Sequence, residues 1–71
     1  MADSVYKVIE LIGTSTESWE RAATNAVTLA AKSLQDLRVA EVIELDMQLE
    51  NGQVLAYRAK IRISFKYQES A

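Results

Sequence analysis

The chain contains no proline and only two glycines, Gly13 and Gly52, among its 71 residues. Glycine and proline are the residues that most strongly interrupt regular secondary structure, so these two positions are expected to mark boundaries between long elements. A chain of this length leaves no room for a second domain. We therefore predict one domain over residues 1–71, built from few and long elements.

The stretch before the first glycine predicts a strand. Residues 4–12, with the sequence SVYKVIELI, are rich in β-branched and aromatic side chains, and apolar residues fall on both faces of the alternating pattern. Gly13 is predicted to end this strand, and Thr14 and Glu17 have the spacing of a capping box that begins a helix. The backbone N–H groups of residues 13–15 are interpreted as ordinary capping donors, with binding of an anion such as phosphate as the alternative.

A single amphipathic helix is predicted from Thr16 to about Leu37. Its apolar residues recur at three- and four-residue spacing, which places them on one face. That face consists mainly of alanine, which allows close approach to a sheet but buries little area per residue. Trp19 lies in phase with these alanines, which favours a core or interface plug over a ligand-stacking residue.

Two alternating strands follow the helix and are joined by Asn51-Gly52, a dipeptide typical of tight hairpin turns. A two-residue loop would place Asp46 opposite Tyr57 and acidic side chains on an apolar face. A three-residue loop with a glycine bulge is predicted instead, which places Glu44 or Asp46 opposite Arg58. The order of elements is therefore β-α-β-β, followed by a polar tail over residues 68–71.

Charge and missing residue types exclude several classes of function. With 8 Lys and Arg against 10 Asp and Glu, the net charge is −2, so the chain lacks the basic field that nucleic acid binding needs. The absence of His and Cys removes the commonest general base, thiolate nucleophiles and the usual zinc ligands, so no enzyme is expected. No apolar stretch is long enough for a membrane span and no targeting segment is evident, so we predict a cytoplasmic protein.

The small size of the chain predicts self-assembly. Chains of about 60 to 70 residues bury only about 60% of their unfolded surface and need a supplement to the core. Disulfides and Cys or His metal sites cannot supply it here, which leaves oligomerisation. The last strand, about fifteen residues long by its pattern, would also leave a long edge that proteins usually pair or protect.

Glu44 and Asp46 are the candidate site residues. They lie two apart on one strand and so share a face, where their oxygens could hold a hard cation or act as an acid and base pair. The alternative is a solvated face with salt bridges to Arg58 and Lys60. A glycosidase-like use of the pair is disfavoured because so small a domain offers no obvious deep cleft.

Three stretches taken together resemble the dodecin family: residues 5–15, VYKVIELIGTS, residues 38–42, RVAEV, and residues 61–67, IRISFKY. The resemblance covers nearly the whole chain, including its length and order of elements. It implies an α+β fold in which a three-stranded antiparallel sheet curves around one long helix. It also implies a hollow homododecamer of cubic symmetry that binds, stores or buffers a small ligand.

The resemblance also bears on the ligand. Flavin-storing dodecins stack each flavin on a Trp and bond it with a Gln, and these positions match Val39 and Arg58 here. Valine offers no π-face, and Arg is a charged group that only donates hydrogen bonds. Residues 14–20, TSTESWE, and 38–47, RVAEVIELDM, are more similar to a second group that lacks the Trp and is described as calcium-binding.

The resemblance therefore favours a divalent cation such as calcium, held by Glu44 and Asp46, with further oxygen ligands from copies that symmetry brings together. Binding and sequestering of riboflavin or FMN is the alternative. A structural assembly without a dedicated ligand, in which Glu44, Asp46 and Arg58 form only salt bridges, is the third possibility.

Overall fold

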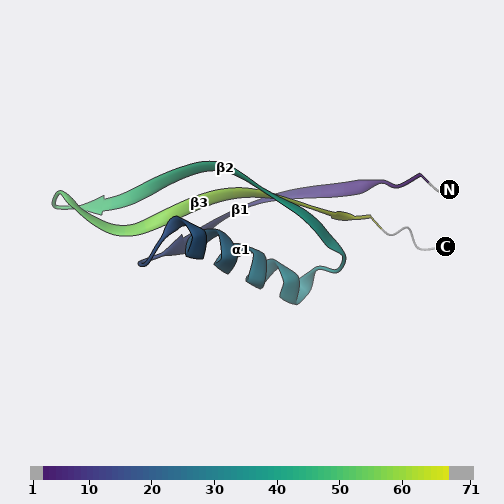
Figure 1. Ribbon diagram of the computed structural model, residues 1–71, viewed down its shortest axis with the longest axis horizontal. Coiled ribbons are helices and arrows are strands. Elements are labelled where there is room, and N and C mark those ends of the chain that lie inside the picture. The colour runs from purple at the N-terminus through teal and green to yellow at the C-terminus, as the bar shows by residue number, and fades with distance from the viewer. Residues whose placement is uncertain (1–2, 68–71) are drawn as a thin grey trace.

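The computed structural model describes residues 3–67 and contains four elements. They are β1 (Tyr6–Ser15), α1 (Trp19–Ser33), β2 (Leu37–Glu50) and β3 (Gln53–Lys66). The strands form an antiparallel sheet in the order β1-β3-β2, and α1 packs on one face of it, here called the inner face (Figure 1). The predicted β-α-β-β order and α+β fold are confirmed. The predicted polar tail lies outside the described residues.

The sequence predicted that Gly13 ends the first strand. In the structure β1 continues to Ser15. Gly13 is buried beneath α1 and pairs with Ala59 of β3. A Cβ atom at this position would overlap the carbonyl oxygen of Ala22 and come within 3.0 Å of the Cβ of Ala26. The missing side chain is thus what lets the helix backbone approach the strand closely, and Gly13 is a packing position rather than a strand end.

Helix α1 is shorter than the predicted span from Thr16 to Leu37 at both ends. Ser18 is its N-cap, and its side chain accepts a hydrogen bond of 3.0 Å from the backbone N–H of Arg21. Thr14 still belongs to β1, so the predicted capping box with Glu17 is wrong, and residues 13–15 are not a helix N-terminus that could bind an anion. No helix in the described part of the chain is long and apolar enough to span a membrane.

The predicted three-residue hairpin loop is also wrong. Glu50 pairs directly with Gln53, so the loop consists of Asn51 and Gly52 alone. Both turn residues have positive φ, 53° and 76°, as a type I′ turn requires. The tight turn is therefore retained, and the mismatch that it would cause is corrected elsewhere in the hairpin.

That correction is a β-bulge inside the strands. Leu49 pairs with Val54 but Gln48 pairs with Ala56, which leaves Leu55 as an extra residue of β3. The extra residue shifts the register by one position beyond the turn. As a result Asp46 lies opposite Arg58, which is one of the two pairings that the sequence predicted.

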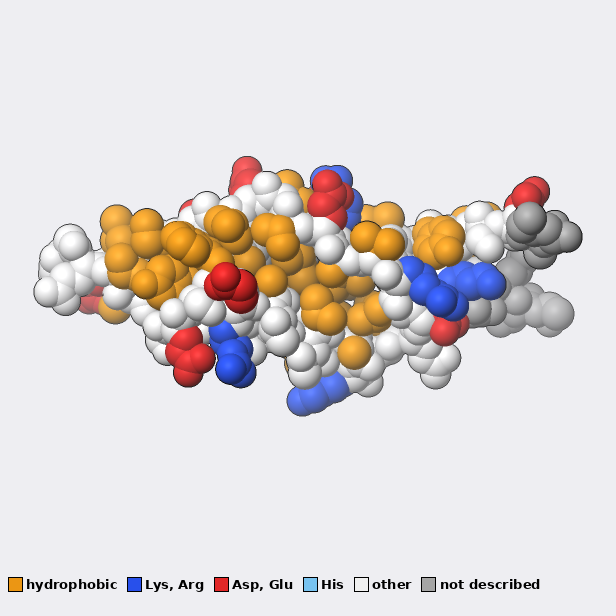
Figure 2. Space-filling view, in the orientation of Figure 1, with side chains coloured by type: hydrophobic (Ala, Val, Ile, Leu, Met, Phe, Trp, Pro, Cys, Tyr) orange, Lys and Arg blue, Asp and Glu red, His pale blue; other side chains and the backbone are white. Residues whose placement is uncertain are grey.

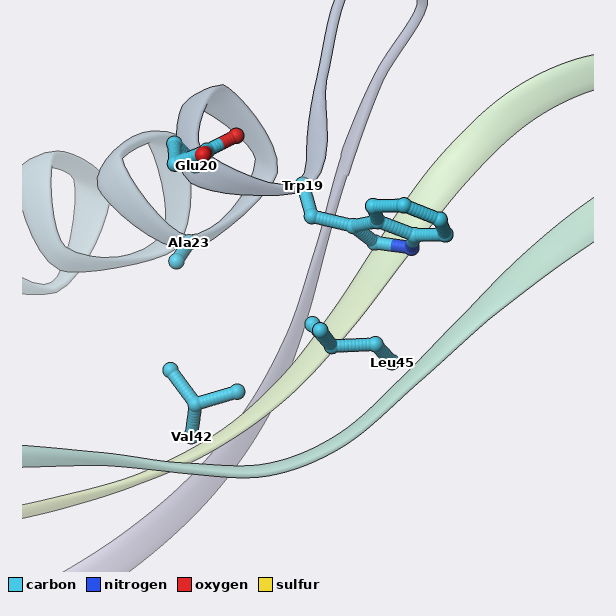
Figure 3. Close-up of a pocket in the computed structure, with 5 residues that line it drawn as sticks. All are labelled: Trp19, Glu20, Ala23, Val42 and Leu45. Atoms are coloured by element: carbon cyan, nitrogen blue, oxygen red, sulfur yellow. The ribbon is translucent and has the colours of Figure 1, made fainter.

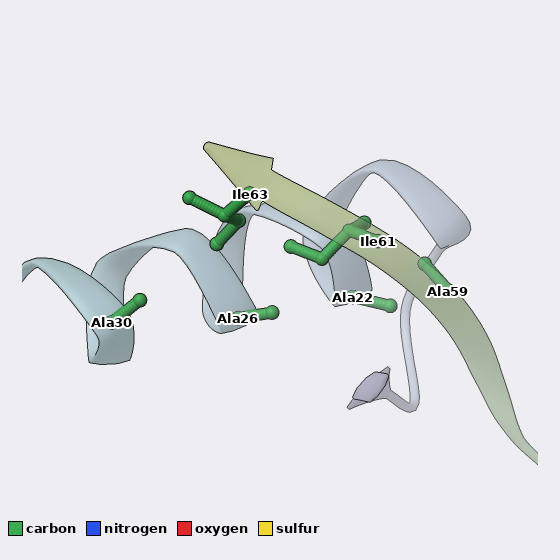
Figure 4. Close-up of a cluster of buried hydrophobic side chains, with 6 residues drawn as sticks. All are labelled: Ala22, Ala26, Ala30, Ala59, Ile61 and Ile63. Atoms are coloured by element: carbon green, nitrogen blue, oxygen red, sulfur yellow. The ribbon is translucent and has the colours of Figure 1, made fainter. Parts of the chain in front are cut away.

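The core between α1 and the sheet is built from small side chains. Its buried residues are Ala22, Ala26 and Ala30 of α1 and Ala59, Ile61 and Ile63 of β3 (Figure 4). Only Ile61 and Ile63 among them are large. The helix packs mainly on β1 and β3 and contacts β2 little, so the inner face of β2 is not covered by the helix.

Four apolar side chains on the uncovered inner face of β2 form a surface that we call the β2 stripe. They are Val42, Leu45, Met47 and Leu49, with 51%, 52%, 45% and 60% of their surface exposed. Their β3 partners on the same face include Ile61 and Ala59 of the core. Figure 2 shows a broad apolar area at the hairpin end of the molecule, where β2 and β3 extend past α1. A single chain thus leaves much of the inner face of its sheet exposed to solvent.

The close approach at Gly13 leads to a stability prediction. Gly13→Ala is expected to lower the free energy of unfolding by on the order of 1–3 kcal/mol, because the added methyl group forces α1 away from β1. Chemical denaturation followed by circular dichroism measures the change. Thr14→Ala is the matched control, since Thr14 is exposed and lies one position along the same strand. An alanine variant at position 13 as stable as the wild type would contradict this packing.

Candidate functional site

The face of the sheet opposite α1, here called the outer face, carries rows of opposed charges. The side chains of Ala59, Ile61 and Ile63 point toward α1, so the basic residues between them, Arg58, Lys60 and Arg62, lie on the outer face. Each faces an acidic residue of β2, in the pairs Asp46 with Arg58, Glu44 with Lys60 and Glu41 with Arg62. The prediction that acidic side chains of one strand and basic side chains of the other share one face of the hairpin is confirmed.

Glu44 reaches the outer face because of a second bulge. Val42 pairs with Ile61 and Glu44 pairs with Lys60, so Ile43 is an extra residue of β2. In a regular strand Glu44 would share the inner face with Val42, and the bulge turns it outward beside Asp46. The two apolar residues in succession, Val42 and Ile43, interrupt the alternation in the sequence and are the local signal of this bulge.

Asp46 is engaged in an ion pair with two hydrogen bonds. The Nε of Arg58 donates to Oδ1 at 2.7 Å, and a terminal nitrogen of the same guanidinium donates to Oδ2 at 3.0 Å. Such two-pronged pairs are the stronger form of carboxylate–guanidinium contact. The salt-bridged arrangement that the sequence offered as the alternative to a cation site is thus present for Asp46.

The ion pair also sets the ionisation of the candidate ligand. The hydrogen bond from Arg58 is the main cause that lowers the pKa of Asp46. Partial desolvation acts in the opposite direction, and the charges of Arg58 and Lys60 add to the lowering. The same contacts raise the pKa of Arg58. Asp46 is therefore an anion throughout the neutral range, which is the form that a cation ligand needs.

Glu44 and Asp46 do not form a complete metal site within one chain. Among residues 3–67, no group of three or more His, Cys, Asp or Glu side chains is placed to hold a metal ion. Two carboxylates offer four oxygens at most, and Ca²⁺ takes six to eight. A calcium ion at Glu44 and Asp46 would therefore need ligands from backbone, water or another copy of the chain.

Val39 and Arg58, the positions that correspond to the flavin contacts of flavin-storing dodecins, both lie on the outer face but in different rows. Val39 pairs with Ser64 near the start of β2 and is 59% exposed. Arg58 lies toward the hairpin, where its guanidinium is paired with Asp46. Within one chain the two side chains do not come together.

Trp19, at the start of α1, contacts both strands of the hairpin. Its indole N–H donates a hydrogen bond of 2.9 Å to the backbone carbonyl of Asp46. Its ring meets that of Tyr57 edge-on, with 5.0 Å between centroids. The sequence predicted a packing role for Trp19, but its link to Asp46 spans 27 positions and no local pattern indicates it.

Beside Trp19 lies a largely apolar pocket of about 530 Å³ between α1 and β2. Its lining consists of Trp19, Glu20 and Ala23 of α1 and Val42 and Leu45 of β2 (Figure 3). Val42 and Leu45 belong to the β2 stripe, so the pocket is part of the inner face that the helix does not cover. It lies on the opposite side of the sheet from the carboxylates of Glu44 and Asp46.

Comparison with known proteins extends the resemblance seen in the sequence. The dodecin family model matches residues 5–68. Calcium dodecin of Mycobacterium tuberculosis is 54% identical over 63 residues, which are 89% of this chain and 89% of that protein. Dodecin of Thermus thermophilus is 35% identical over 66 residues, 93% of this chain and 96% of that protein.

Solved structures agree with the sequence relatives. The structure of dodecin from Streptomyces coelicolor superposes with a TM-score of 0.92 at 36% identity and covers 99% of this chain and 100% of that one. The crystal structure of calcium dodecin from Mycobacterium tuberculosis, described as calcium chelating with a novel calcium-binding site, has a TM-score of 0.83 at 51% identity. That match covers 96% of this chain and 97% of that one.

The lowered pKa of Asp46 predicts how the stability of the fold depends on pH. Because the folded-state pKa lies below the unfolded value, the ion pair stabilises the fold above the unfolded pKa, and this contribution is lost as pH falls through the folded pKa. Asp46→Asn is therefore expected to reduce the melting temperature slightly at neutral pH and to have no effect in strong acid.

Thermal melts of the wild type and the Asp46→Asn variant, recorded from about pH 7 down to about pH 2, test this expectation. Glu50→Gln is the control, because it removes an exposed carboxylate at the end of the same strand. A stability difference between wild type and Asp46→Asn that is the same at every pH would show that the ion pair is not its cause.

Proposed function

This chain belongs to the dodecin family, and from that premise we propose that it binds and stores a divalent cation such as calcium. The ligands proposed for this chain are Glu44 and Asp46 on the outer face of the sheet. The proposal extends to the assembly, a shell of twelve copies. The observation that carries the choice of ligand is the 54% identity with a calcium dodecin over 89% of the chain.

The chemistry of the outer face supports a hard cation. Glu44 and Asp46 present carboxylate oxygens on one side of β2, and oxygen is the ligand atom that calcium prefers. Asp46 is held in its ionised form by its surroundings. Because one chain supplies too few oxygens, the site is completed in this proposal by carboxylates of a neighbouring copy related by symmetry.

The exposed apolar surface supports assembly into a shell. The β2 stripe lies on the inner face, and Tyr6, Val8 and Ile12 of β1, on the outer face, are each about half exposed. Contiguous apolar patches of this kind mark protein interfaces more often than free surface. In the proposed shell, further copies of the chain cover these surfaces.

Membership of the dodecin family supports a ligand-binding or storage role rather than catalysis. Flavin binding remains the alternative ligand assignment, since other members of the family bind flavins. It is less favoured here because Val39 has no ring to stack on a flavin and Arg58 is held by Asp46. A structural assembly without a ligand is the third candidate. The cytoplasmic location stays a prediction.

Calcium titration tests the proposal directly. Isothermal titration calorimetry on chelator-treated protein is expected to show saturable calcium binding by the wild type. Asp46→Asn removes one anionic ligand oxygen and is expected to weaken binding at least about tenfold, equivalent to about 1.4 kcal/mol. Glu50→Gln removes the same charge from an exposed position farther along β2 and is expected to bind as the wild type does.

Three results would count against the calcium assignment. If the Asp46→Asn variant binds calcium as tightly as the wild type, Asp46 is not a ligand. If Glu50→Gln weakens calcium binding as much as Asp46→Asn does, the loss of negative charge in general is the cause, and not the loss of a ligand. A wild-type protein that is yellow as purified and gives no calcium heat would favour the flavin alternative.

A further inference from the structure

Asp46, one of the two proposed calcium ligands, is not free to bind a cation in the chain as it folds. Both of its carboxylate oxygens accept hydrogen bonds from the guanidinium of Arg58, at 2.7 and 3.0 Å. The guanidinium therefore occupies the side of the carboxylate on which a calcium ion would be held by both oxygens at once. Bidentate coordination of calcium by Asp46 therefore requires these hydrogen bonds to break.

The ion pair is placed so that it can open. The side chains of Arg58 and Asp46 are 39% and 49% exposed, so a displaced guanidinium can be solvated by water without crossing a packed interior. The neighbour of Arg58 on β1 is Thr14, a neutral residue that is also exposed. Although the two hydrogen bonds make this a strong form of the contact, its exposure to solvent makes it less costly to open than a buried pair.

Arg62, two positions along β3, shows the contrasting arrangement. Its guanidinium lies 3.0 Å from a carboxylate oxygen of Glu10 on β1 and 3.7 Å from one of Glu41 on β2. The row of Arg62 thus joins three strands, whereas Arg58 has Asp46 as its acidic partner among the described residues. Among the described residues, loss of the Asp46 contact would leave Arg58 without an acidic partner to hold it on the sheet.

We propose that Arg58 is a built-in competitor for Asp46, so that a divalent cation is held by both oxygens of this carboxylate once it displaces the guanidinium. The inference rests on the proposed function, since it concerns the same carboxylate. It makes Arg58 a residue that sets affinity and selectivity. A monovalent cation such as Na⁺ offers too little charge to replace two charge-assisted hydrogen bonds, whereas Ca²⁺ does so when further oxygens complete its coordination.

Competition predicts a change opposite in sign to that of a structural role. If Arg58 only supported the fold, its removal would weaken calcium binding. If it competes, Arg58→Gln frees Asp46 and is expected to tighten calcium binding on the order of three- to tenfold. Arg58→Lys keeps the charge but lacks the planar fork that matches a carboxylate, and is expected to lie between wild type and Arg58→Gln.

The experiment is a calorimetric titration of CaCl₂ into chelator-treated wild type, Arg58→Gln, Arg58→Lys, Arg62→Gln and Asp46→Asn. Arg62→Gln is the matched control, since it removes one positive charge from the same strand and face at similar side-chain exposure, 45% against 39%. It is expected to shift calcium affinity much less than Arg58→Gln. Size-exclusion chromatography and thermal melts establish that each variant folds and assembles as the wild type does.

The outcomes separate this inference from the proposed function. Wild-type binding that Arg58→Gln leaves unchanged or weakens overturns the competitor role and leaves the calcium site standing. Equal tightening by Arg62→Gln also overturns it, because general charge would then be the cause. If Arg58→Gln binds calcium and the wild type does not, competition is supported and calcium storage by the wild type is overturned. If neither protein binds calcium, the competitor role and the proposed function are both overturned. If Arg58→Gln fails to assemble, Arg58→Lys decides by the same criterion.

Discussion

The close contact between α1 and Gly13 is the constraint on which the rest of the structure depends. With no side chain at this position, the helix backbone rests directly on β1, and alanines at Ala22 and Ala26 keep the distance short. A helix seated in this way covers β1 and β3 and leaves β2 largely uncovered. The small core and the exposed β2 stripe are therefore two consequences of the same packing, and together they explain why further copies of the chain are needed in the proposed shell.

The sheet separates two kinds of surface. Its inner face bears the small core, the β2 stripe and the apolar pocket beside Trp19, and its outer face bears the rows of paired charges. Two bulges maintain this separation, because one corrects the register beyond the tight turn and the other rotates Glu44 outward. The hydrogen bond from Trp19 to the Asp46 carbonyl connects the two faces, since it fixes the backbone of a proposed ligand from the opposite side of the sheet.

Sequence patterns predicted the order of elements and the position of the hairpin, and they narrowed the partner of Arg58 to Glu44 or Asp46, of which the structure has Asp46. They failed where a residue's role depends on a distant partner. Gly13 is an example. Its neighbours in the sequence indicate a strand end, because the helix residues that pack on it, Ala22 and Ala26, lie later in the chain. The sequence predicted a longer loop because a bulge at Leu55 and a bulge in the turn have the same effect on the alternation of side chains. The pattern alone cannot distinguish the two. The cation ligands that are proposed to come from other copies likewise lie beyond the pattern of a single chain.

Native mass spectrometry of the protein as purified, before and after treatment with a chelator, tests the central claim most directly, since one spectrum reports the number of chains and the bound mass. The account predicts a mass near that of twelve chains, with small additional increments that the chelator removes. A monomer would contradict the assembly that the uncovered face of β2 is proposed to require. A twelve-chain particle with no removable increments, or with increments the size of a flavin, would contradict the calcium site.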